Sequence, residues 1–158
     1  MRRLVIAPLV VAAITPVLVG AAPVATTTLP APTPARTPVP FTLLVTDTDT
    51  EGRVFTAPNG QVLYRYSGDD LAHGVFGCTG GCLTTHRPLL TRPGTQLRLP
   101  PGVAGTLSAT VRPDHVGDQV TLDGAPLYSF IGDRPDDVNG DTLHWHAVQA
   151  LPAPPSTG

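Results

Sequence analysis

The chain of 158 residues contains no lysine, and its only glutamate is Glu51. The absence of lysine excludes Schiff-base chemistry and a lysine general base. With a single glutamate, any pair of catalytic carboxylates has to be built almost wholly from aspartate. The sequence also lacks a Gly-x-Ser-x-Gly elbow, a phosphate-binding glycine loop and a His-Glu-x-x-His zinc motif. These absences favour a non-enzymatic role.

Clusters of basic residues are missing as well. Ten arginines stand against twelve acidic residues, and Arg2 and Arg3 lie at the very start of the chain. Without the first 21 residues, eight arginines remain and the net charge is near −4. A mildly acidic chain without a basic patch has no electrostatic attraction for nucleic acid or for an anionic membrane surface. We therefore expect no nucleic-acid partner.

The sequence has only one long apolar run, and it lies at the N-terminus. Arg2 and Arg3 precede an uncharged, mostly apolar stretch over 4–19, and the small residues "VGAAP" follow. This is the pattern of an export signal, so we expect residues 1–21 to be a signal peptide cleaved after Ala21. The alternative is an uncleaved N-terminal anchor, which would make the membrane a partner. Cleavage predicts a protein that is secreted or held in the cell envelope.

Both flanks of the remaining chain have a composition that cannot form a core. Residues 22–40 are mainly proline, threonine and alanine, with one charge. Such a segment favours an extended, disordered linker. Residues 153–158 predict a short disordered tail by the same reasoning. The folded domain is therefore expected over 41–152.

The domain itself lacks the 3.6-residue periodicity of amphipathic helices. Glycine and proline interrupt it about every ten residues, and valine, threonine and leucine dominate between them. This pattern predicts an all-β fold, with a small antiparallel sheet or sandwich of short strands. The strands are expected near 42–46, 52–57, 61–66, 106–111, 118–122, 125–130 and 143–149.

One phrase occurs twice in this domain. "LYRYSGDD" begins at Leu63, and "LYSFIGDR" begins 64 residues later at Leu127. Asn-Gly at 59–60 precedes the first copy and Asp-Gly at 123–124 precedes the second, and both dipeptides favour type I′ turns. Each copy is therefore expected to be the second strand of a hairpin. The domain is expected to consist of two related hairpin repeats.

The aromatic residues of each copy alternate with other residues. Tyr64 and Tyr66 therefore share one face of their strand, and so do Tyr128 and Phe130. Aromatic side chains bury the most area per residue, so we expect them to pack in the core. The alternative is an exposed platform on which a ring-shaped ligand stacks.

A glycine and an aspartate end each copy. Asp69 and Asp133 are expected to accept backbone N–H groups and to fix the turn at the exit of each strand. The alternative is that both carboxylates belong to a functional site.

The doubled Tyr-x-aromatic-x-x-Asp pattern resembles a bacterial secreted-repeat family, described as predicted lipoproteins with a conserved Yx(FWY)xxD motif. "GCTGGCLTTHRPLL", "GDQVTLDGAPLYSF" and "HWHAV" are similar to that family's cysteine segment, hairpin and closing strand. The resemblance covers most of residues 52–149 and implies export, an all-β fold, two repeats and Trp145 in the core, with no settled activity. The chain departs from the family where His86 and Arg87 replace tryptophan and proline, and it has no cysteine for lipid attachment.

The two cysteines, Cys78 and Cys82, enclose Thr-Gly-Gly. In an exported protein this spacing predicts a disulfide, which would stabilise so short a loop by about 2 kcal/mol. The alternative is a copper or zinc site. Cys78, Cys82 and His86 would supply its first ligands, with help from His144 and His146.

These observations predict an exported, non-enzymatic β module of the cell envelope or the extracellular space. It would have a structural role or bind an envelope partner or a small ligand. The alternative is a metal-binding or redox-linked envelope protein that uses the cysteines and His86.

Overall fold

The computed structural model describes Gly20 and residues 40–155. The expected signal peptide and linker lie outside the described residues, apart from Gly20 and Pro40, and so do the last three residues of the expected tail. The described residues form short strands and two short 3-10 helices, which confirms the all-β fold class. Among the described residues, no helix has the length and apolarity needed to cross a membrane.

One antiparallel sheet carries both copies of the repeat. Its strands are β5 (His86–Pro88), β11 (Tyr128–Phe130), β4 (Leu63–Tyr66) and β12 (Trp145–Ala147), in the spatial order β12-β4-β11-β5. The first copy forms β4 and the second forms β11, and the two strands pair directly, with Tyr128 opposite Tyr64. The repeats are therefore neighbours at the centre of a single sheet.

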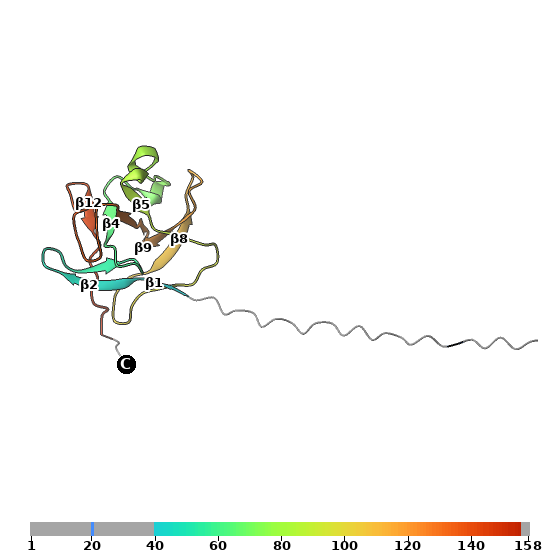
Figure 1. Cartoon of the computed structure of the whole chain (residues 1–158), viewed down its shortest axis with the longest axis horizontal. Helices are drawn as coiled ribbons and strands as arrows, with labels where there is room; N and C mark the ends of the chain where they lie inside the picture. The colour runs from blue at the N-terminus through green and yellow to red at the C-terminus, as the bar shows by residue number, and fades with distance from the viewer. Residues whose placement is uncertain (1–19, 21–39, 156–158) are drawn as a thin grey trace, which may run out of the picture. The chain divides into compact units, whose positions relative to one another are not determined.

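A second antiparallel sheet is centred on β9 (Asp118–Leu122). This strand pairs with β8 (Leu107–Val111), and it also pairs with β10 (Ala125–Pro126) and β6 (Leu90–Thr91). Two smaller pairs complete the strands. Two 3-10 helices follow β4 in the chain and precede β5, and they form the green segment at the top of the domain in Figure 1. These elements are β2 (Leu44–Thr48) with β3 (Gly52–Thr56), β1 (Phe41–Thr42) with β7 (Leu97–Arg98), η1 (Leu71–His73) and η2 (Gly80–Thr84).

The two predicted turns form, but only one has the predicted geometry. Asp123 and Gly124 have φ angles of 52° and 82°, as a type I′ turn requires. At the first turn Gly60 has a φ of 85°, whereas Asn59 is not in the positive-φ region. The Gly60 N–H donates to the Ala57 carbonyl, so a longer turn joins β3 to β4. The type I′ prediction for residues 59–60 is wrong.

The second copy also departs from the expected hairpin. β10 pairs with β9 as predicted, but at Leu127 the chain leaves that sheet and enters the other one as β11. Pro126 ends β10 at the margin of its sheet, where a residue without an N–H is tolerated. The hairpin prediction therefore holds up to Pro126 and fails beyond it, because β11 pairs with β4 and β5 instead.

The sheet of the repeats separates two hydrophobic cores. Leu63 and Leu127 lie in one core, and Tyr64 and Tyr128 lie in the other, all four fully buried. Trp145 joins the second core. The predicted alternation of faces is confirmed, and the two leading tyrosines are core residues rather than a platform for a ligand. The sequence did not predict β5, β6 and β7, because strands of two or three residues show no alternation.

Candidate functional site

Reciprocal hydrogen bonds tie the two copies of the repeat together. The Tyr64 hydroxyl donates to Asp133 Oδ2 at 2.5 Å, and the Tyr128 hydroxyl donates to Asp69 Oδ1 at 3.3 Å. Each tyrosine therefore bonds the aspartate of the other copy. Each aspartate also accepts a backbone N–H from the loop that follows it, at 2.8 and 2.9 Å. The aspartates fix the strand exits and, in addition, join the repeats.

The glycine of each copy lies against the second aromatic ring of the same copy. A Cβ on Gly68 would lie 2.4 Å from the Tyr66 ring, and one on Gly132 would lie 2.5 Å from the Phe130 ring. Both contacts are too short for any side chain. The glycines are therefore needed so that the chain can fold back over the rings before it reaches the aspartates.

Burial dominates the electrostatics of the tyrosine–aspartate pairs. It raises the pKa of both carboxyl groups, Asp69 and Asp133, although their hydrogen bonds act in the opposite direction. It also raises the pKa of Tyr128 to about 12 and that of Tyr64 further. Both phenols therefore stay protonated at neutral pH and remain hydrogen-bond donors.

Arg112 connects this pairing to the second sheet. Its side chain is fully buried. Its guanidinium donates to the Asp114 carboxylate at 2.6 Å, to the Gln119 side-chain oxygen at 2.5 Å and to the Cys78 carbonyl at 2.8 Å. It also lies 3.4 Å from the Tyr128 hydroxyl. The hydrogen bonds from Arg112 hold the pKa of the Asp114 carboxyl below its usual range. Sequence reasoning missed this residue, because a single arginine between Val111 and Pro113 carries no signal of burial.

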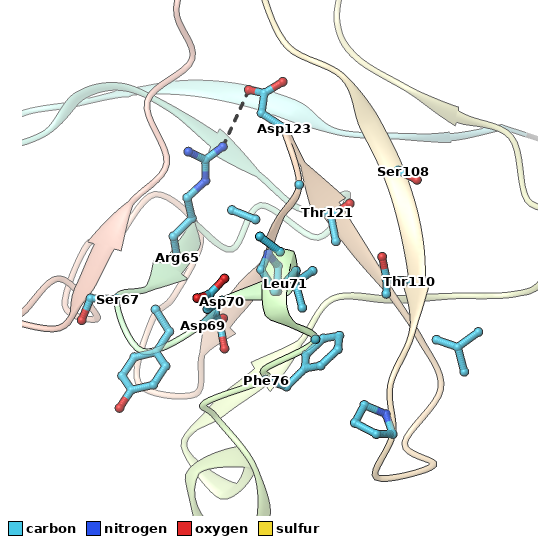
Figure 2. A pocket seen from close by; sticks show the side chains of 18 of the residues that line it. Arg65, Ser67, Asp69, Asp70, Leu71, Phe76, Ser108, Thr110, Thr121 and Asp123 are labelled. Atoms are coloured by element: carbon cyan, nitrogen blue, oxygen red, sulfur yellow. Dashed lines mark ion pairs between the residues drawn. The ribbon is translucent and has the colours of Figure 1, made fainter.

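A cleft of about 990 Å³ opens beside Asp69. Its walls come from β4 and the loop that follows it, from β8, and from the turn between β9 and β10, with His146 of β12 at its margin. In Figure 2, Arg65 and Asp123 lie at one end of the cleft and Phe76 lies near the other, with Thr110 on the β8 side. The cleft therefore lies where the sheet of the repeats meets the second sheet.

The lining of the cleft is more acidic than basic. Asp69, Asp70 and Asp123 line it, and among the described residues Arg65 is the one arginine of the lining. Arg65 donates to the Leu122 carbonyl at 2.9 Å, and its guanidinium lies 3.8 Å from Asp123. Asp69 Oδ2 and Arg65 Nε are both buried without a hydrogen-bond partner among the described residues. Such unpartnered atoms are uncommon in folded proteins, and two of them belong to this one lining.

The predicted disulfide between Cys78 and Cys82 is present, with the two Cα atoms 5.4 Å apart. It consumes both thiols, so neither is a free ligand. In the described part of the chain, no group of three histidine, cysteine or acidic side chains is placed to hold a metal ion. The structure therefore does not form the alternative copper or zinc site.

The three histidines of that alternative are separated in the structure. The imidazole of His86 stacks on Trp145, with ring centroids 3.7 Å apart and an interplanar angle of 4°. It thus occupies, as an aromatic ring, the position where the family resemblance expects tryptophan. His144 contacts the Ser67 hydroxyl at 3.3 Å, and the exposed His146 borders the cleft. Burial lowers the pKa of His86, which keeps its ring neutral in the stack.

Sequence reasoning did not identify the cleft. Alternation puts Arg65 on the face opposite Tyr64 and Tyr66, and Asp123 belongs to the predicted turn, but nothing in the spacing of the two residues brings them together. Searches with family models, curated proteins and solved structures found no match to this chain. The resemblance to the secreted-repeat family stays a prediction.

Proposed function

We propose that this protein is an exported, non-enzymatic binding module of the cell envelope or the extracellular space, and that it holds its ligand in the cleft beside Asp69. The observation that carries the proposal is the cleft lining. It combines a volume of about 990 Å³ with the half-exposed carboxylates of Asp70 and Asp123 and with the guanidinium of Arg65. A ligand of complementary charge gains ion pairs and hydrogen bonds from these groups.

Rigid support of the cleft favours binding. Asp69 is held by a loop N–H and by Tyr128, and Tyr128 is in turn held by the buried Arg112. A wall fixed from both sheets loses little conformational entropy when a ligand binds. Asp133 uses one carboxylate oxygen for Tyr64 and the other for a loop N–H, and the unpaired oxygen of Asp69 is closed off from solvent. Neither carboxylate is therefore placed to act as a general base on a substrate in the cleft. These contacts support a binding role over a hydrolytic one.

Chemical-shift mapping on isotope-labelled protein tests the location of the site. The probes are a lysine-rich peptide, an N-acetylglucosamine oligomer and a dicarboxylic acid, each titrated separately. We expect the amide signals of Arg65, Thr110 and Thr121 to shift with at least one probe. The variant Thr110→Trp, which fills the cleft, should abolish the shifts, and Val116→Trp on the exposed hairpin should not. Binding that shifts residues elsewhere, or that survives Thr110→Trp, contradicts the proposed site.

Export is tested by expressing the full chain with a C-terminal tag in a bacterial host. N-terminal sequencing of the protein from outside the cytoplasm should begin at Ala22. Recovery of the tagged protein only from the cytoplasm, with residue 1 or 2 at its N-terminus, would contradict export. Recovery from the membrane with the first 21 residues intact would show an anchor instead.

A further inference from the structure

The outer edge of β8 has unpaired backbone groups. The Asp123 N–H donates to the Thr106 carbonyl and the Arg112 N–H donates to the Gly117 carbonyl, which fixes the alternation of the β8–β9 ladder. The N–H and C=O groups of Ser108 and Thr110 therefore point toward β9. The N–H and C=O groups of Leu107, Ala109 and Val111 point away from β9. None of these outward groups bonds another described residue.

The margins at β12, β5 and β2 are protected. On β12, Asp141 accepts the outward N–H of Ala147 at 2.8 Å, and the Trp145 carbonyl accepts an N–H from Thr142 at 2.8 Å. β5 includes an arginine and a proline, and β2 includes an aspartate. Charges, prolines and caps of this kind prevent edge-to-edge pairing. The sequence of β8 is Leu-Ser-Ala-Thr-Val and has none of these protections.

The unprotected strand is also a wall of the cleft. Ser108 and Thr110 line the cleft, and Thr121 lies opposite Ser108 on the same face. Alternation places Ala109 and Val111 on the other face of β8, where both are exposed. Val111, at the end of the strand, is 73% exposed and also borders the cleft. A strand added beside β8 would therefore direct every second side chain toward the acidic lining. The alternate side chains of the added strand would lie beside the exposed Ala109 and Val111.

We propose that the ligand is an extended polypeptide segment that adds to β8 as a strand, with lysine or arginine side chains on the cleft side and apolar side chains on the other. This inference rests on the proposed function and names the class of its ligand. The backbone groups of Leu107, Ala109 and Val111 supply the hydrogen bonds of the added strand, as in other cases of strand addition to a sheet edge. Asp70 and Asp123 select the basic side chains.

A synthetic peptide of four Lys-Val repeats, capped at both ends, is the probe. Binding is measured by titration calorimetry at low salt. The control peptides are four Glu-Val repeats, which reverse the charge, and the Lys-Val peptide N-methylated at its valines, which removes every second backbone donor. We expect the Lys-Val peptide to bind and both control peptides to bind at least about tenfold more weakly, because each loses charge pairing or ladder bonds.

Variants of the protein separate the contribution of the backbone hydrogen bonds to peptide binding from that of the charged side chains. Ala109→Pro removes one outward N–H without touching the ladder to β9, and it should weaken the Lys-Val peptide about tenfold. Ala109→Ser is the matched control and should bind as the parent does. Asp123→Asn and Asp70→Asn keep the shapes of the side chains and should each weaken binding about two- to fivefold at low salt. If Ala109→Pro does not fold, the N-methylated peptide on the parent protein gives the same information.

Equal affinity for the Lys-Val peptide and its N-methylated form overturns the inference. So does equal affinity for the Lys-Val and Glu-Val peptides, or no binding of either at protein and peptide concentrations of 1 mM or about that level. Sedimentation of the parent and Ala109→Pro proteins shows whether a second copy occupies the edge, which would also overturn it. The proposed function fails separately, when the cleft-filling Thr110→Trp variant keeps all its ligand binding.

Discussion

Removal of one hydroxyl from each copy of the repeat gives the sharpest test of the reciprocal pairing. Tyr64 is fully buried, and its hydroxyl serves two partners. It donates to Asp133 Oδ2 at 2.5 Å and accepts the Gly140 N–H at 3.2 Å. Tyr64→Phe leaves a buried carboxylate oxygen and a buried N–H without partners. A buried group left unpaired costs about 1–3 kcal/mol, so we expect a loss of about 2–4 kcal/mol of unfolding free energy.

The other copy supplies the matched control. Tyr128 is equally buried, but its hydroxyl contacts are longer, 3.3 Å to Asp69 and 3.4 Å to Arg112. Asp69 keeps its bond from a loop N–H, and Arg112 keeps its other acceptors. Tyr128→Phe should therefore cost about 1 kcal/mol. Tyr66→Phe, at a partly buried ring whose hydroxyl has no partner in the described chain, should change stability by less than about 0.5 kcal/mol.

Urea unfolding monitored by Trp145 fluorescence measures all three variants, since this is the only tryptophan in the chain. With a typical slope of about 2 kcal/mol per molar urea, Tyr64→Phe should lower the midpoint by roughly 1–2 M. The slope itself should not change. The reasoning is refuted if Tyr64→Phe costs less than Tyr128→Phe, or if both variants cost no more than Tyr66→Phe.

Three further predictions follow from the geometry. Gly68→Ala should lower the free energy of unfolding by about 1–3 kcal/mol, because the new Cβ would lie 2.4 Å from the Tyr66 ring. Gly81→Ala is the control: its Cβ would lie in open space, so the melting temperature should change little. Burial raises the pKa of Asp133 in the folded protein. The contribution of this carboxyl group to the free energy of unfolding is therefore complete below the unfolded pKa of about 3.9, and it is lost as the pH rises through the folded pKa. Urea titrations from pH 3 to pH 7, or about that range, should therefore show the parent losing stability relative to Asp133→Asn, and a constant difference would contradict this sign. Reduction of the disulfide should cost about 2 kcal/mol, and a reductant should have no effect on the variant that carries alanine at both cysteine positions.

Local patterns in the sequence were sufficient for the class of fold and for the positions of most strands along the chain. Alternation around Tyr64 and Tyr128 predicted which side chains share a face, because a two-residue period fixes the face of each side chain regardless of the partner strand. It did not predict that the opposite face, with Leu63 and Leu127, is buried as well, or that Tyr66 and Phe130 are only partly buried. The Asp-Gly turn predicted the hairpin of β9 and β10, because the positive φ angles are a property of those residues. The spacing of the cysteines, together with the expected export, predicted the disulfide, because a loop as short as five residues with two glycines can close without help from distant parts of the chain. Export and the linker stay predictions from composition.

Tertiary structure alone decided which residues meet. The two copies pair with each other rather than within their own hairpins, and each tyrosine bonds the aspartate of the other copy, because the chain changes sheets at Leu127. The burial of Arg112, the stacking of His86 on Trp145 and the cleft between Arg65, Asp69 and β8 depend on the same change. Contacts between residues separated by 40–80 positions depend on which strands pair with each other. Strand pairing is determined by the packing of the whole domain, so a local sequence pattern does not predict it.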